Sequence, residues 1–280
     1  MPENCKNNNN RLLLIVPLIL FVVGLCYYQV MYPLYSGIRG LDEDPAYVYL
    51  FSGLSILQGE SPTHTHHPGT PLQLLIAVII SLKWFASVIF FSEANTLVQS
   101  VFINPEAYLA TASMVLLAVN TFAVHFFGRK IFQCTGNILL SIFGQTAPLL
   151  YPLISPRLVF CSPESLLIAV TLILLGCSMH LMFNSRSNSD TLSSPAILGI
   201  LIGIGLAVKV TFFPMMGILL FLSNIKNILK ASIVAVGAFC ISILPIWNQV
   251  PRMYQWYTGL ASHDGNYGQG KQQFIDLTQV

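Results

Sequence analysis

The chain of 280 residues is 54% hydrophobic and only 9% charged, whereas a soluble domain carries about a quarter charged residues. This composition excludes a water-soluble globular protein and is typical of a polytopic membrane protein. The formal net charge is +2 and the basic residues are scattered between apolar runs, so nucleic acid is not an expected partner. The cysteines show no CxxC or Cys/His spacing, and we interpret them as buried hydrophobic residues.

Several apolar runs are long enough to cross a membrane, because a bilayer core about 30 Å thick needs roughly 20 apolar residues per helix. The first run has no Ala-x-Ala-like cleavage site, so we interpret it as an uncleaved membrane helix. Residues 196–222 are interrupted by Lys209 and Pro214, which predicts two short helices that meet at a polar point. The sequence therefore predicts an all-α, polytopic membrane helix bundle formed as a single domain by residues 1–280. The runs that are long enough to span lie near residues 12–33, 71–91, 107–127, 137–154, 164–183 and 231–247.

The orientation follows from basic residues in short loops, which concentrate on the cytoplasmic side. These residues fall into four groups: Lys6/Arg11, Arg129/Lys130, Arg186 and Lys226/Lys230. The four basic groups lie on the same side of the membrane only if one of the two apolar runs between Tyr32 and Arg129 does not cross it. We predict that residues 71–91 lie at the outer interface, because the run begins at Pro71 and carries Lys83 and Trp84. The alternative is an ordinary span with one failure of the positive-inside rule.

In this orientation the first loop region, residues 34–106, lies on the non-cytoplasmic side of the membrane. The turn at 155–163, the surroundings of Lys209 and a tail at 248–280 lie on the same side. Most acidic residues of the chain then lie outside. The expected location is the plasma (inner) membrane of a bacterium or the endoplasmic reticulum membrane of a eukaryote.

The first outer loop holds the most informative residues. Asp42, Glu43 and Asp44 follow the first membrane helix, and Pro45 suits the first turn of a new helix with Asp44 as its N-cap. A simple cap, with Asp42 and Glu43 as solvated loop charges, is the alternative interpretation.

The order of residues in this loop resembles that of the GT-C superfamily of glycosyltransferases, which includes protein O-mannosyltransferases and lipid A aminoarabinose transferases. There, an acidic residue after the first membrane helix precedes a Tyr-bearing helix, a glycine and a His-Pro-Pro-Leu-like element. The counterparts here are Asp44, Tyr47, Gly59 and residues 67–72, His-Pro-Gly-Thr-Pro-Leu, in which Gly69 and Thr70 separate the prolines. The likeness in layout extends to Ser-Pro-Glu-Ser at 162–165 and Gly-Leu-Ala-Val-Lys at 205–209.

The resemblance implies an enzyme that moves a sugar from a polyprenyl-phosphate carrier to a lipid, glycan or protein acceptor on the non-cytoplasmic face. Such enzymes usually have more membrane helices, so we expect a short or C-terminally truncated member. The reaction needs a carboxylate base for the attacking group and cations for the phosphate. We assign the base to Asp44, with Asp42 and Glu43 as its rivals.

Lys209 interrupts an apolar run, which makes it a candidate ligand of the carrier phosphate; snorkelling to the interface is the alternative. Arg157 is a second candidate cation on the turn before Glu164, and we include both residues among the substrate-binding candidates. The alternative is that these two residues pair with each other or face water.

His66 and His67 are candidates for substrate hydrogen bonds. With His64 they form a run without a fourth metal ligand, so no metal site is predicted, although a divalent cation and structural packing stay open. His263 and Tyr267 lie in a Gly-rich polar segment that suits contact with a sugar or pyrophosphate; a plain flexible loop is the alternative. Two other functions remain: a transporter or flippase, since broken helices around a lysine also occur there, and a non-catalytic membrane subunit.

Overall fold

The computed structural model describes residues 11–35, 46–62, 64–65, 69–91, 94–150, 156–183, 195–222, 224–263 and 270. Every regular element within these residues is a helix, which confirms the all-α prediction. Among the described residues, three helices are long and apolar enough to cross a membrane: α4 (Thr70–Phe91), α6 (Pro105–Thr135) and α10 (Ile225–Ser242).

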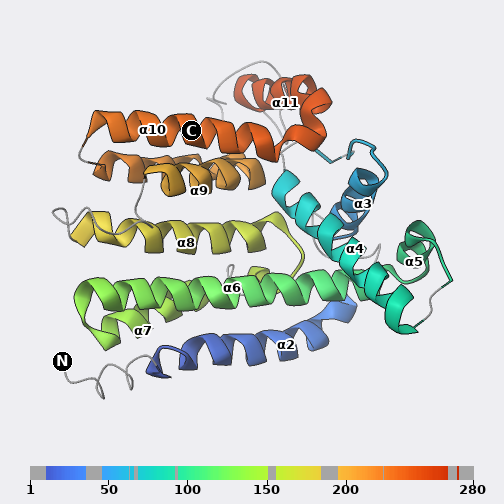
Figure 1. Ribbon diagram of the computed structural model, residues 1–280, viewed down its shortest axis with the longest axis horizontal. Coiled ribbons are helices and arrows are strands. Elements are labelled where there is room, and N and C mark those ends of the chain that lie inside the picture. Colours follow the sequence, from blue (N-terminus) through green and yellow to red (C-terminus); the bar gives the residue numbers. More distant parts are fainter. Residues whose placement is uncertain are drawn as a thin grey trace.

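The main body of the protein is a row of helices that lie side by side (Figure 1). The order across the row is α2 (Ile15–Tyr35), α6, α8 (Pro163–Phe183), α9 (Pro195–Val208) and α10, and each helix contacts the next. At one end of the row lie α3 (Ala46–Leu57), α4, α5 (Leu97–Ile103) and α11 (Val250–Ser262), and we call this the loop end.

The opposite end holds the start of α2, the end of α6 and the start of α10 (Figure 1). Arg11, Arg129, Lys130, Lys226 and Lys230 belong to these helix ends, and we call it the basic end. The basic groups that the positive-inside argument placed together are therefore close to one end of the row. Lys6 and Arg186, which belong to the same argument, lie outside the described residues.

Over the described part of the predicted span at residues 137–154, the helix is shorter than expected and is interrupted. The helix α7 covers only Ile138–Thr146 and is followed by the single 3₁₀ turn η1 (Ala147–Leu149). Nine α-helical residues rise about 14 Å, which is less than half of a bilayer core. The physical reason is visible in the sequence, where Pro148, Pro152 and Pro156 repeatedly remove a backbone donor and block helix continuation.

The turn before α8, which begins with the 3₁₀ helix η2 (Pro156–Leu158), is held inside the protein by Asn120 of α6. Its Nδ2 donates to the Leu158 carbonyl at 3.1 Å and to Ser165 Oγ at 2.9 Å. Leu158, Val159 and Cys161 are buried, so the irregular backbone is covered by protein. This burial meets the condition under which non-helical backbone is tolerated at membrane depth.

The broken apolar run at 196–222 forms two short helices, as predicted. The helix α9 ends at Val208, and the 3₁₀ helix η4 (Val210–Phe221) follows directly. The break falls at Lys209, whose extended φ of -158° separates the two, whereas Pro214 is accommodated within η4. At Gly205 an added Cβ would lie 2.3 Å from the Phe212 ring, so the return of the chain requires a glycine there.

The helix α4 runs at a steep angle to the row of helices and packs against α3 at the loop end (Figure 1). Val78, Leu82, Phe85 and Ile89 are exposed on α4, and their helical spacing gives α4 an apolar stripe facing away from the protein. The α3 residues Tyr49, Leu50 and Leu54 are buried, so α3 is packed within the protein and does not simply lie on a surface.

Candidate functional site

Glu164 is placed at the start of α8 by a local capping arrangement. Ser162 precedes the helix and its Oγ accepts a hydrogen bond from the Ser165 backbone N–H at 3.4 Å. Pro163 occupies the first helical position, where its missing N–H costs nothing. Glu164 follows in the first turn, where the helix dipole favours a negative charge. The carboxylate is thus held at the loop end, where α8 begins (Figure 1).

Lys209 is placed at the tip of the α9–η4 hairpin. Its backbone N–H donates to the Gly205 carbonyl at 3.0 Å and closes α9, while its own carbonyl accepts from the Phe212 N–H at 3.0 Å and opens η4. The lysine therefore belongs to neither helix and its side chain leaves the hairpin at the turn.

Lys209 and Glu164 form an ion pair, with 2.6 Å between Lys209 Nζ and Glu164 Oε1. The two side chains are 23% and 29% exposed, so the pair is sheltered and still reachable. The positive charge of Arg157 also acts attractively on Glu164. Of the predicted substrate-binding residues, Lys209 and Glu164 are thus in contact, and Arg157 lies near enough for its charge to act on Glu164.

Segments between α3 and α5 contact elements that neighbour this pair. The helix α4 contacts α9, which ends beside Lys209. Ser61, after α3, donates from Oγ to Asn248 Oδ1 at 2.9 Å, and Asn248 lies in η5 (Leu244–Gln249) just before α11. Ser61 and α4, which flank the His-Pro-Gly-Thr-Pro-Leu element at residues 67–72, are therefore held at the end of the protein that carries Lys209 and Glu164.

A second polar cluster lies where α3, α4 and α5 meet the start of α6. Tyr47 of α3 donates a hydrogen bond to the Glu106 carboxylate. Lys83 Nζ of α4 donates to the Ala107 carbonyl at 2.6 Å and to Thr111 Oγ1 at 2.9 Å. Tyr108 contributes a ring whose centroid lies 5.3 Å from the Lys83 ammonium group. These hydrogen bonds hold α3 and α4 against α6, so we assign this cluster a role in stabilising the fold.

The catalytic candidates cannot be placed relative to this site. Asp42, Glu43 and Asp44, together with His66, His67 and Tyr267, lie outside the described residues. His263 is described: it follows α11, and Ser262 Oγ lies 3.0 Å from its Nδ1. Among the described contacts, none joins His263 to Glu164 or Lys209.

Sequence reasoning missed two polar residues that the structure makes important. Asn120 lies in the middle of an apolar helix, a position that is unfavourable for a polar side chain without a partner, and this signal was available. Lys83 was interpreted only as a sign of an interfacial helix, whereas its ammonium group has defined partners on α6. Each of these residues bonds to residues far along the chain, and the sequence around it does not indicate which partner it has.

Burial raises the pKa of two ionisable groups at the loop end further above neutral pH. Desolvation raises the pKa of the Cys161 thiol to about 12, because the thiolate would lose its hydration in the protein interior. Desolvation also raises the pKa of Tyr257 on α11 to about 12. Neither group is therefore ionised near neutral pH. Within the described part of the chain, no group of three or more His, Cys, Asp or Glu residues is placed to hold a metal ion.

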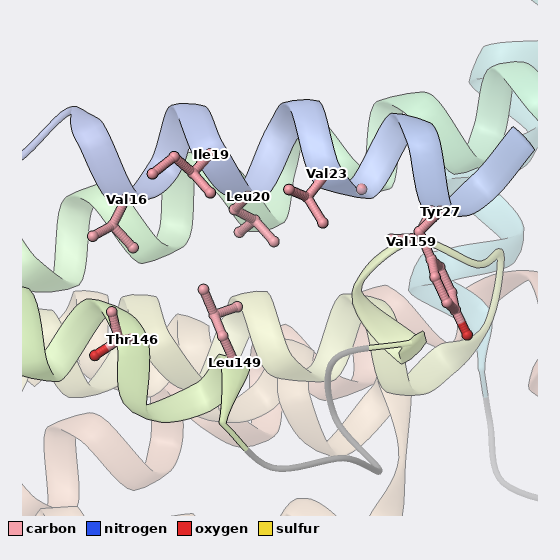
Figure 2. Close-up of a pocket in the computed structure, with 9 residues that line it drawn as sticks. Val16, Ile19, Leu20, Val23, Tyr27, Thr146, Leu149 and Val159 are labelled. Carbon is pink, nitrogen blue, oxygen red and sulfur yellow. The ribbon is translucent and has the colours of Figure 1, made fainter. Parts of the chain in front are cut away.

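An apolar groove of about 350 Å³ runs along α2. Figure 2 shows Val16, Leu20 and Val23 of α2 facing Thr146 and Leu149 across this space. The groove lies between α2 on one side and the ends of α7 and η1 on the other. One end is closed by Tyr27 and Val159, and Val159 is two residues from Arg157.

Comparison with known proteins adds no assignment: no family model, no curated protein and no solved structure matches this chain. The likeness to the GT-C superfamily therefore rests on the residues quoted above and stays a prediction.

Proposed function

We propose that this chain is a multi-pass membrane glycosyltransferase that moves a sugar from a polyprenyl-phosphate carrier to an acceptor on the non-cytoplasmic face. The observation that carries the proposal is the sheltered Lys209–Glu164 pair with Arg157 nearby. A cation at the tip of a broken apolar hairpin is costly to maintain in a membrane protein and is usually functional.

The charges suit the phosphate of the sugar donor. When a sugar is transferred, the bond between its anomeric carbon and the phosphate oxygen breaks and the carrier phosphate leaves as an anion. Lys209 and Arg157 would stabilise this developing charge. Glu164 holds the Lys209 ammonium group in place before the donor arrives, and its capped position on α8 keeps the orientation fixed.

The apolar groove along α2 fits the same donor. Its apolar lining would accept part of the prenyl chain, and its closed end at Val159 adjoins the turn that carries Arg157. A donor with its tail in this groove would present its phosphate on the side of the protein where the cations gather.

The acceptor must lose a proton as it attacks, and we assign this proton to the Asp44 carboxylate. Replacing a general base typically lowers the rate by about 10² to 10⁴. Losing a helix cap costs only about 1 kcal/mol of stability and leaves turnover in the folded protein largely unchanged. The two roles of Asp44 can thus be separated.

The deciding experiment measures sugar transfer by the purified protein from a defined polyprenyl-phosphate sugar. Asp44→Asn keeps the shape and most capping ability of the side chain, so we expect turnover to fall by about 10² or more with donor binding nearly unchanged. Asp42→Asn and Glu43→Gln are the matched controls. Activity that survives Asp44→Asn and disappears in one of the controls would move the base to that residue.

A flippase is the second candidate, and the α9–η4 break favours it, because discontinuous helices around a charged residue also build transport sites. Proteoliposomes that contain the protein and a labelled donor distinguish the two functions. Movement of the donor between leaflets without any transfer of sugar would support the flippase. Neither activity would support a non-catalytic membrane subunit.

A further inference from the structure

A small polar cavity lies between α2 and α6 toward the basic end, away from the candidate site. Its volume is about 170 Å³, and it is lined by Leu13, Leu14, His125 and Arg129. His125 and Arg129 are one helical turn apart on α6 and therefore share a face. Since a water molecule occupies about 30 Å³ of liquid volume, the cavity has room for a group of several heavy atoms.

The polar groups of this cavity suit an anion. His125 Nδ1 lies 3.3 Å from the Leu13 carbonyl oxygen, which can only accept, so Nδ1 carries the hydrogen and Nε2 of the neutral ring can accept a hydrogen bond, such as one from a lipid headgroup hydroxyl. Arg129 is exposed, and no hydrogen bond or ion pair of its guanidinium group occurs within the described residues. A guanidinium group offers several donors in a geometry that matches phosphate oxygens.

The position of the cavity matches the boundary between apolar membrane and polar headgroups. Arg129 follows Pro105 by 24 positions, which corresponds to about 36 Å along α6, somewhat more than a bilayer core. At the start of α2, the exposed residues Leu14, just before the helix, and Ile15 and Leu18 within it begin the apolar surface directly beside the cavity. Arg11 precedes them and adds a further positive charge to this end.

We propose that the cavity between the start of α2 and α6 binds the headgroup of an anionic membrane lipid, with Arg129 as donor to its phosphate and His125 as acceptor for a headgroup hydroxyl. The proposal rests on the proposed membrane insertion and is independent of glycosyl transfer. The two kinds of molecule that could bind here, an anionic lipid and free inorganic phosphate, share a phosphate anion. The lipid is favoured over free phosphate because the cavity opens beside the apolar start of α2, where the acyl chains of a bound lipid would lie. Basic pockets between helices are known lipid headgroup sites.

Binding is measured by native mass spectrometry of the purified full chain, titrated with phosphatidylglycerol or with neutral phosphatidylcholine. We expect preferential retention of phosphatidylglycerol. Arg129→Gln should weaken this retention by about tenfold, as for loss of a hydrogen bond to a charged group, and His125→Asn should also weaken it. Lys230→Gln removes one charge from the same end away from the cavity, and we expect its effect to stay within about twofold.

Three results would overturn the proposal. Unchanged affinity in both Arg129→Gln and His125→Asn would exclude the cavity as the site. An equal loss in Lys230→Gln would mean that diffuse surface charge attracts the lipid. Displacement of phosphatidylglycerol by millimolar inorganic phosphate would assign the cavity to a free anion. Because lipid retention is read without any sugar donor, a failure of the glycosyltransferase proposal leaves this test unaffected.

Discussion

At the scale of single residues, the Lys209 ammonium group has the clearest functional expectation. Lys209 Nζ donates a hydrogen bond to Glu164 Oε1 at 2.6 Å, and both side chains are partly exposed. In the proposed function, a donor phosphate approaches Lys209 from the open side and shares it with Glu164. The carboxylate would position the cation, and the cation would bind the phosphate.

We predict that Lys209→Met weakens binding of the sugar donor by about 10- to 150-fold, since a hydrogen bond to a charged group is worth about 1.5–3 kcal/mol. Donor binding by the purified protein is the measurement. Lys83→Met is the matched control, because the Lys83 ammonium group already donates to Ala107 and Thr111. The control should lower thermal stability and leave donor affinity intact. Unchanged donor affinity in a well-folded Lys209→Met protein would refute the assignment.

A second residue-scale prediction concerns Asn120, which holds the buried turn before α8. Asn120→Leu would leave the Leu158 carbonyl and the Ser165 hydroxyl without this amide, at a cost of about 1–3 kcal/mol. The turn should then open and expose Cys161. Burial keeps the pKa of Cys161 at about 12, so in the wild-type protein its thiol should resist alkylation at pH 7.5.

Peptide mapping after treatment with N-ethylmaleimide in detergent checks this prediction. Modification of Cys161 should rise in Asn120→Leu and stay low in the wild type, whereas the partly exposed Cys134 should react equally in both. Gln133→Leu, at an exposed position of α6, is the matched polar-to-leucine control. Equal protection of Cys161 in all three proteins would show that Asn120 does not hold the turn.

At the scale of elements, the closest helix packing joins α9 and α10. A Cβ added at Gly199 would lie 2.4 Å from the Ala231 carbonyl oxygen, and one at Gly203 would lie 2.3 Å from that of Ala235. The two glycines are four positions apart, the spacing by which small residues let membrane helices approach closely. This contact fixes the hairpin that carries Lys209.

We predict that Gly203→Leu separates the two helices and lowers the free energy of unfolding by about 1–3 kcal/mol. Donor binding should fall with it, because the Lys209 turn is displaced. Gly237→Ala on α10 is the matched control, since a Cβ there meets nothing within 4 Å; it should be neutral or slightly stabilising. Thermal unfolding in detergent measures both, and equal unfolding temperatures would mean that the contact between α9 and α10 is not tight.

Most helices were predictable from the sequence because each corresponds to an apolar run, and the break at Lys209 was predictable because a charge interrupts one. The short α7 was not predicted, although its prolines marked the end of the helix, because apolar composition alone does not distinguish a crossing helix from a buried turn. The Lys209–Glu164 pair joins residues 45 positions apart, so each charge could be singled out while their contact depended on the packing of α8 against α9.

At the scale of the whole molecule, the angle of α4 decides the topology. The helix lies across the loop end and not along the row (Figure 1), and Lys83 ties it to the start of α6. Its length and hydropathy would also allow it to cross a membrane. If α4 lies at the interface, the segments before and after it share one side, and the basic end faces the cytoplasm.

The last prediction tests this arrangement with single cysteines in a cysteine-free background. Gln58, Asn95 and Ser262 belong to the loop end, whereas Asn137 precedes α7 at the basic end. A membrane-impermeant thiol reagent applied to intact cells should label Gln58→Cys, Asn95→Cys and Ser262→Cys, and it should label Asn137→Cys only after the membrane is opened. The reason is that an interfacial α4 adds no crossing between residues 58 and 95. Labelling of Gln58→Cys and Asn95→Cys from opposite sides would show that α4 spans the bilayer. Labelling of Asn137→Cys in place of the other three would show that the whole orientation is inverted.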